Sequence, residues 1–134
     1  MYDLIDRPVA DLPRFEHVVL DETRRWVHAL TLAGAAPMVP AGFTDHGGPV
    51  VARTFDSLMR DLDQGSTETL VFERPCHSTV SETEAVMLGL WRLVRADRIA
   101  AARAAAAALV DDASARRIVA AMVRIVGTGF VALD

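Results

Sequence analysis

Apolar residues recur every three or four positions in several separate stretches of the chain, a spacing that predicts helices. In residues 14 to 33, the apolar positions that share one broad face are Phe15, Val18, Val19, Trp26, Ala29, Leu30 and Ala33. Asp11 can cap this helix, and Pro13 suits its first turn, where a missing N–H costs nothing. Gly34 and Pro37 end the pattern, so we predict a helix over 14–33 with its Trp buried.

Two further helices are predicted in the middle of the chain. One covers about 49–63, where Pro49 suits the start and Gly65 the stop. The other covers about 82–96, where Ser81 and Glu84 have the three-residue spacing of a capping box.

The last third of the chain predicts two more helices, near 98–110 and 112–126. If the 82–96 helix continued, Asp97 would lie in the middle of its apolar face, so we predict a break there with Asp97 capping the next helix. Asp111 and Asp112 favour the start of the last helix by capping and by charge.

Two short segments are extended rather than helical in character. Residues 69–73 read Thr-Leu-Val-Phe-Glu, and residues 129–133 are similar, so the two can pair as a small ribbon. Residues 1–10 are expected to form an irregular arm on the body. The overall prediction is an all-α chain, with residues 1–134 forming a single compact domain of about five helices.

Length and composition agree with a globular protein. The chain has 134 residues, of which 51% are hydrophobic, enough for one domain with a core. The longest uncharged run, residues 26–44, is broken by glycines and prolines, so we expect no membrane segment. Cys76 is the one cysteine, and the first residues lack a secretion pattern, so a cytoplasmic location is expected.

All fourteen basic side chains are arginine, and the chain has neither lysine nor asparagine. Schiff-base chemistry on lysine, lysine-bearing phosphate loops and N-linked glycosylation are therefore excluded. Net charge is −4, and the arginines after residue 91 are spread among alanines, a weak form of the basic face that nucleic-acid binders present. Nucleic acid is not an expected partner.

The densest cluster of reactive side chains lies just before the predicted 82–96 helix. Arg74, Cys76 and His77 are close together there, and Asp45 and His46 precede another helix start. A nearby arginine, histidine or helix N-terminus can activate a thiol, so these five residues are the candidate ligand-binding set. The alternatives are a simple Gly-Gly-Pro turn at residues 47–49 and a cysteine that acts as a small buried hydrophobe.

A second candidate cluster lies along the first helix. His17, Asp21, Arg24 and His28 are spaced so that their side chains stack on one face. Metal ligation is conceivable for this set, but the face is opposite Trp26, and we predict solvated charge pairs.

No complete catalytic set and no cofactor motif appear, so we lean to a non-enzymatic interpretation and expect no cofactor. Wide apolar arcs on several helices favour an interaction or regulatory module that works as a homodimer or with a protein partner. One alternative is a small-ligand or metal site between the loops at 44–48 and 74–81. Another is a DNA-associated regulator that uses its C-terminal arginines, namely Arg92, Arg95, Arg98 and Arg103.

Overall fold

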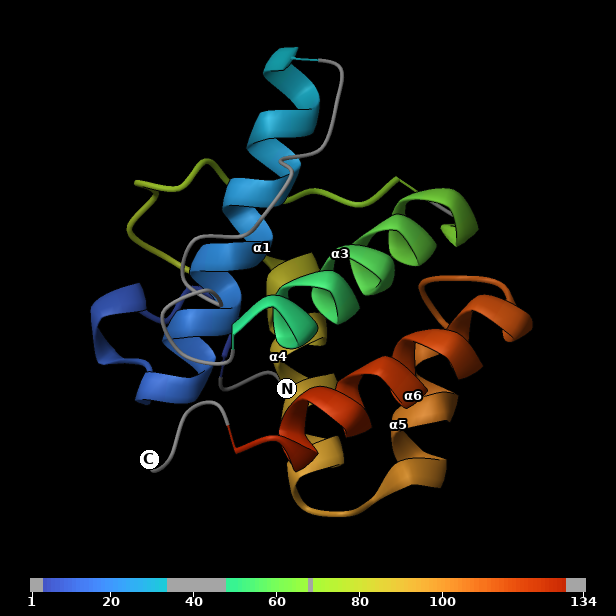
Figure 1. Cartoon of the computed structure of the whole chain (residues 1–134). Helices are drawn as coiled ribbons and strands as arrows, with labels where there is room; N and C mark the ends of the chain where they lie inside the picture. Colours follow the sequence, from blue (N-terminus) through green and yellow to red (C-terminus); the bar gives the residue numbers. More distant parts are fainter. Residues whose placement is uncertain (1–3, 34–47, 68, 130–134) are drawn as a thin grey trace.

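The arrangement of helices is given by a computed structural model that describes residues 4–33, 48–67 and 69–129 (Figure 1). The elements are a short 3-10 helix η1 (Val9–Asp11), α1 (Arg14–Ala33), α3 (Gly48–Gly65), α4 (Glu82–Arg95), α5 (Ile99–Ala106) and α6 (Asp112–Gly127). The described residues contain no strand, so the predicted all-α class is confirmed. None of the described helices is both long enough and apolar enough to cross a membrane.

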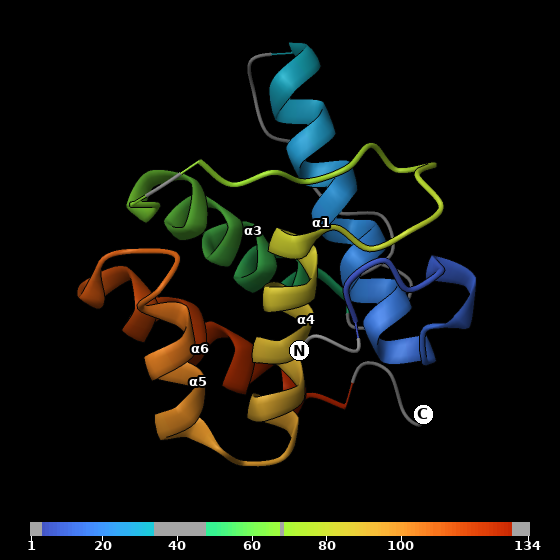
Figure 2. The ribbon, with the colours of Figure 1, turned by 180° about the vertical axis from the view of Figure 1, so that it is seen from behind.

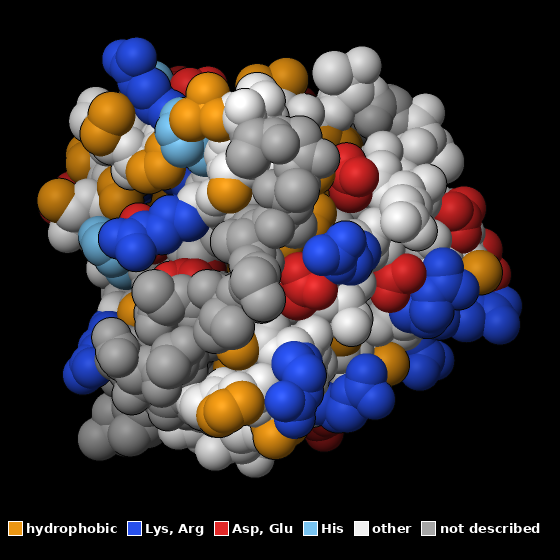
Figure 3. Space-filling view, turned by 45° about the horizontal axis from the view of Figure 1, so that its top comes forward, with side chains coloured by type: hydrophobic (Ala, Val, Ile, Leu, Met, Phe, Trp, Pro, Cys, Tyr) orange, Lys and Arg blue, Asp and Glu red, His pale blue; other side chains and the backbone are white. Residues whose placement is uncertain are grey.

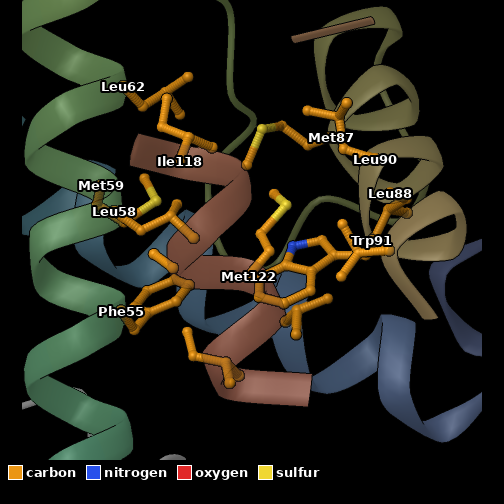
Figure 4. Packing of buried hydrophobic residues seen from close by; sticks show 14 of the residues in the cluster. Phe55, Leu58, Met59, Leu62, Met87, Leu88, Leu90, Trp91, Ile118 and Met122 are labelled. Carbon is orange, nitrogen blue, oxygen red and sulfur yellow. The ribbon is translucent and has the colours of Figure 1, made fainter. Parts of the chain in front are cut away.

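The core forms where α3, α4 and α6 face one another. Helices α3 and α6 run side by side, and α4 contacts α1, α5 and α6 (Figures 1 and 2). Figure 4 shows apolar side chains of α3, among them Phe55 and Leu58, pointing toward Met122 of α6 and Trp91 of α4. Phe15 of α1 meets Trp91 edge-on, with ring centroids 5.5 Å apart, which joins α1 to this core.

Local capping signals mark the starts of α4 and α6 as predicted, whereas Asp11, the predicted cap of the first helix, belongs to η1 instead. Ser81 and Glu84 form both bonds of the capping box, at 3.3 and 3.0 Å. Asp111 caps α6 by accepting a 2.8 Å bond from the backbone N–H of Ser114. That bond, together with the Ser114 hydroxyl, holds the pKa of Asp111 below its ordinary value of 3.8.

The predicted break near Asp97 is present, but the predicted role of this residue is wrong. Asp97 takes the left-handed conformation, with φ of 60°, and reverses the chain between α4 and α5. Arg98 occupies the N-cap position instead, without a side-chain hydrogen bond. Helix α5 also ends earlier than predicted, because Val110 leaves it to form a bridge with Ser66 beside the end of α3.

The predicted ribbon between 69–73 and 129–133 is not supported. Residues 130–133 lie outside the described part, and residues 69–73 form no strand. They belong to the connector, which we define as residues 66–81 between α3 and α4, with residue 68 not described. Figure 2 shows the connector running from the end of α3 across α1 and back to α4.

The N-terminal arm, rather than the C-terminal tail, pairs with the connector. Asp6 N–H donates to Val80 O at 2.9 Å, Val80 N–H donates to Arg7 O at 3.0 Å, and Val9 N–H donates to Ser78 O at 2.8 Å. These bonds surround an antiparallel bridge and bring Leu4 into the core, where its side chain is buried. The second half of the connector is therefore paired along its backbone.

Gly65 allows the end of α3 to approach the start of α6 closely. Its carbonyl accepts a 2.9 Å bond from Asp111 N–H, and a Cβ at this position would collide with the Ser114 side chain. Ser114 belongs to the capped start of α6, so its side chain has little freedom to move. Close contact between these helices thus requires a residue without a side chain here.

We expect Gly65→Ala to lower the free energy of unfolding by about 1–3 kcal/mol, because the added methyl overpacks the α3–α6 contact. Gly127→Ala is the matched control, since a Cβ there meets nothing within 4 Å. The control is expected to be neutral or stabilising by up to about 1 kcal/mol. Chemical denaturation of both variants measures the difference, and equal effects would show that the Gly65 contact is not tight.

Candidate functional site

A buried ion pair between Arg24 of α1 and Glu84 of α4 lies at the centre of the site. Arg24 Nε donates to Glu84 Oε2 and Arg24 Nη2 donates to Glu84 Oε1, both at 2.8 Å. The side chains are 1% and 0% exposed. A two-bond pairing of this kind fixes the relative orientation of the two groups as well as their distance.

The same two side chains also hold the connector. Arg24 donates to the backbone carbonyls of His77 at 2.7 Å and Thr79 at 2.8 Å. Glu84 accepts from the backbone N–H groups of Glu73 at 2.9 Å and Ser81 at 3.0 Å. The pair is therefore the point where α1, α4 and both halves of the connector are joined.

The buried position of Arg24 corrects the expectation of a solvated stripe along α1. The connector covers the face of α1 that carries Arg24, so its guanidinium meets Glu84 rather than water. His17 and His28 stay exposed as expected. Asp21 forms an exposed pair with the neighbouring Arg25 at 3.1 Å.

Glu84 stays ionised in this environment. Burial by itself would raise the pKa of its carboxyl group. Hydrogen bonds from Arg24 and from the N–H groups of Ser81 and Glu73, with the positive charge of Arg24, outweigh burial and lower the pKa below its ordinary value of 4.5. The charged form of the pair is thus the form that the fold stabilises.

A small pocket of about 290 Å³ lies where η1, α1 and the connector meet, and we call it the polar pocket after the charged and titratable side chains in its lining. Its lining includes Cys76 and His77 from the predicted candidate set, together with His17 and Asp21 of α1. Cys76 is exposed. The two ring nitrogens of His77 face other partners, with Nδ1 3.5 Å from Glu73 Oε2 and Nε2 3.3 Å from Thr79 Oγ1, so His77 is not arranged as a base for the thiol.

The other members of the predicted set do not complete a site in the described part of the chain. Asp45 and His46 lie outside the described residues, so their meeting with Cys76 stays a prediction. Arg74 is exposed, and its carbonyl accepts the His77 N–H at 3.0 Å. Among the residues described, no group of three or more His, Cys, Asp or Glu side chains is placed to hold a metal ion.

A larger groove lies between α1, α3 and the first half of the connector, and we call it the apolar groove. It encloses about 470 Å³. Its lining residues are Trp26, Val27, Leu30, Met59, Leu62, Asp63, Ser66, Thr67, Thr69, Leu70 and Phe72. The Trp26 indole N–H is fixed by a 3.0 Å bond to Asp56, so this wall of the groove is held in place.

Periodicity alone did not reveal the groove, because its residues come from three elements far apart in the sequence. Trp26 was predicted to be buried, and it is, but the prediction carried no information about a cavity beside it. The available signal was the apolar run Leu70, Val71 and Phe72 within a polar connector.

Along the groove, one edge of the connector's backbone is hydrogen-bonded to side chains at the start of α4. Val71 N–H donates to Thr83 Oγ1 and Val71 O accepts from Ser81 Oγ, both at 3.2 Å, while Glu73 N–H donates to Glu84. In the part of the chain that the structure describes, the backbone groups of Leu70 and Phe72 make no hydrogen bond. One edge of this segment is therefore open.

We expect Arg24→Met to lower the free energy of unfolding by about 3–5 kcal/mol, because Glu84 would remain buried without its counter-charge. Arg25→Met is the matched control, since Arg25 is 55% exposed in its pair with Asp21. The control is expected to change stability by about 0.5 kcal/mol or less. Urea denaturation compares the two variants. Similar losses of stability would mean that the buried pair contributes no more than the exposed one.

The lowered pKa of Glu84 predicts a specific acid sensitivity. The unfolded chain takes up a proton on Glu84 near pH 4.5, before the folded protein does, so the stabilisation is complete above this pH and is lost as the pH falls through the folded-state pKa. Between about pH 5 and about pH 3, Glu84→Gln should show a shallower loss of stability than the wild type, by at most about 1.4 kcal/mol per pH unit. Denaturation series at several pH values test this, and parallel curves would contradict it.

No protein-family model, no curated protein and no solved structure matches the chain. The geometry of the buried pair, the polar pocket and the apolar groove is therefore the basis for assigning a function.

Proposed function

We propose that the protein is a non-enzymatic interaction module whose apolar groove takes up an apolar segment of a partner protein. The observation that carries the proposal is the groove itself, about 470 Å³ in volume, with an apolar wall on α1, α3 and the connector. Cavities of roughly 300–1,000 Å³ with mainly apolar walls and few polar groups are typical of binding sites.

Partial exposure of the groove residues supports this proposal. Val27 and Leu30 of α1 and Leu70 and Phe72 of the connector are only half-buried, although they pack against the core. A bound apolar side chain would remove this surface from water, at about 25 cal/mol per Å². Burial of apolar surface thus supplies a favourable part of the binding free energy at the groove.

The chemistry of the lining also supports a binding role over a catalytic one. Asp63 is the one titratable side chain among the described lining residues, and no base–nucleophile pair of the kind that activates a hydroxyl or thiol is among them. The hydroxyl groups of Ser66, Thr67 and Thr69 supply polar contacts at one end. Such a lining can orient a ligand without reacting with it.

Self-association is a second candidate for the use of apolar surface. Among the residues that the structure describes, four large apolar side chains are exposed on four different elements, namely Leu32, Val50, Val71 and Val123. A homodimer would need several of them to meet in one interface of about 1,200 Å² or more. Sedimentation over a wide concentration range tests for it, and a constant monomer mass would remove this candidate.

The polar pocket is a third candidate, for a small ligand. It brings His17 and Asp21 to the same cavity as Cys76 and His77, an arrangement that spacing along the chain did not predict. However, Arg24, which also lines it, already donates from all three nitrogens to Glu84 and to backbone carbonyls. Its charge is thus committed inside the fold, which ranks this candidate behind the apolar groove.

Nucleic-acid binding ranks last, because two of the four proposed arginines make internal contacts. Arg92 pairs with Glu16 at 2.8 Å, and Arg95 lies over the Phe15 ring, 4.2 Å from its centroid. On the face in Figure 3, several basic side chains gather toward one edge, and acidic side chains lie beside them. A phosphate backbone is bound best by an unbroken basic stripe.

A selection from a random ten-residue peptide library tests the groove. We expect enriched peptides to shift the NMR signal of the indole N–H of Trp26, a residue that lines the groove, and not that of Trp91, which does not line it. Leu30→Arg should weaken their binding at least tenfold by placing a charge in the groove. Fluorescence anisotropy with labelled peptides measures the affinity.

Val123→Arg is the matched control, since it adds the same charge to an exposed valine of α6 outside the groove lining. It should change the affinity by less than about twofold, and thermal melts of both variants check that each is folded. No enriched peptide, or peptides that bind Leu30→Arg as well as the wild type, would overturn the proposal.

A further inference from the structure

We infer that the partner segment binds as an extended strand added along the open edge of the connector at Leu70 and Phe72. This inference rests on the proposed function and names the conformation and chemistry of the bound segment. Addition of a strand to an exposed backbone edge is a recurrent way to bind peptides, with main-chain bonds giving affinity and alternate side chains giving specificity.

The first step is the direction of the backbone groups. Both the N–H and the C=O of Val71 bond to side chains at the start of α4, and so does the N–H of Glu73 two residues later. Groups two residues apart that point the same way are the signature of an extended chain. The groups of Leu70 and Phe72 therefore point away from α4, toward the open side.

The second step is the contrast between the two halves of the connector. In the second half, Val80 and Ser78 bond to the backbone of the N-terminal arm. In the first half, no described segment forms such bonds with Leu70 or Phe72. The connector thus already pairs its backbone with one other segment of the chain, and the unpaired half presents the same kind of edge.

The third step is the position of the side chains. Leu70 and Phe72 line the groove, whereas the Val71 side chain is 54% exposed. A strand beside this edge would direct every second side chain to the same face and hence into the groove. The segment is also held in advance by Glu84 and Thr83, which reduces the loss of conformational entropy on binding.

The fourth step is charge. Asp63 is the one charged residue in the described lining, its side chain is exposed, and no ion pair to it is found among the described residues. It lies at the end of α3, where the polar part of the groove begins. The occupant that fits is an extended peptide with apolar residues at alternate positions and an arginine or lysine facing Asp63.

The tightest peptide from the library selection provides the probe. Two versions of this peptide are made. One carries N-methyl groups on its odd-numbered backbone amides, and the other carries them on its even-numbered backbone amides. An extended peptide should lose at least tenfold in affinity with the set that faces the connector, and change by less than about twofold with the other set. In the NMR spectrum of the protein, the amide signals of Leu70 and Phe72 should shift and gain protection from exchange.

Asp63→Asn tests the charge, with Asp112→Asn on α6 as the control. The first should weaken binding of a peptide that contains a basic residue by about two- to fivefold, and the second should leave it unchanged.

Equal losses with both methylated versions, or unchanged signals of Leu70 and Phe72, would overturn the extended conformation while the groove still binds. Failure to enrich any peptide would instead overturn the proposed function, and self-association through the groove would identify a second copy of the chain as its occupant.

Discussion

The fold around the groove depends on one buried ion pair. Taking two charges out of water costs several kcal/mol for each ion, and the cost is offset only where the geometry is good and the remaining polar atoms are bonded. Arg24 and Glu84 meet this condition with two bonds to each other, two to backbone carbonyls and two from backbone N–H groups. Because those backbone groups belong to the connector, the pair determines where the connector can lie as well as how α1 meets α4.

The positions of the apolar groove and the polar pocket follow from that placement. Where the connector crosses α1, its first half borders the apolar groove and its second half borders the polar pocket. Its first half is bonded to the start of α4 through Thr83 and Glu84, so its outer edge stays open. Its second half is bonded to the arm through Ser78 and Val80, so its edge is closed. The apolar groove therefore borders the half of the connector whose outer edge is open, and the polar pocket borders the half whose edge is closed.

The sequence predicted what depends on neighbours along the chain. The periodic apolar faces, the capping box at Ser81 and the cap at Asp111 are local features, and they gave the helical class and the helix starts. Arg24 was misplaced because its partner is 60 residues away, and Glu84 was recognised only in its local capping role. The extended character of residues 69–73 was recognised. An apolar pattern does not reveal which groups bond the backbone of such a segment, and here they are side chains at the start of α4 rather than another strand.

Glu84 acts both as the third residue of a capping box and as the counter-ion of Arg24. Helix ends are ordinarily where hydrogen bonds open first, independently of the rest of a protein. Here the first turn of α4 cannot open without also breaking the contact to α1 and releasing the connector. The start of α4, the middle of α1 and the segment that crosses them should therefore exchange their amide hydrogens as one cooperative unit, with the groove existing only while that unit is closed.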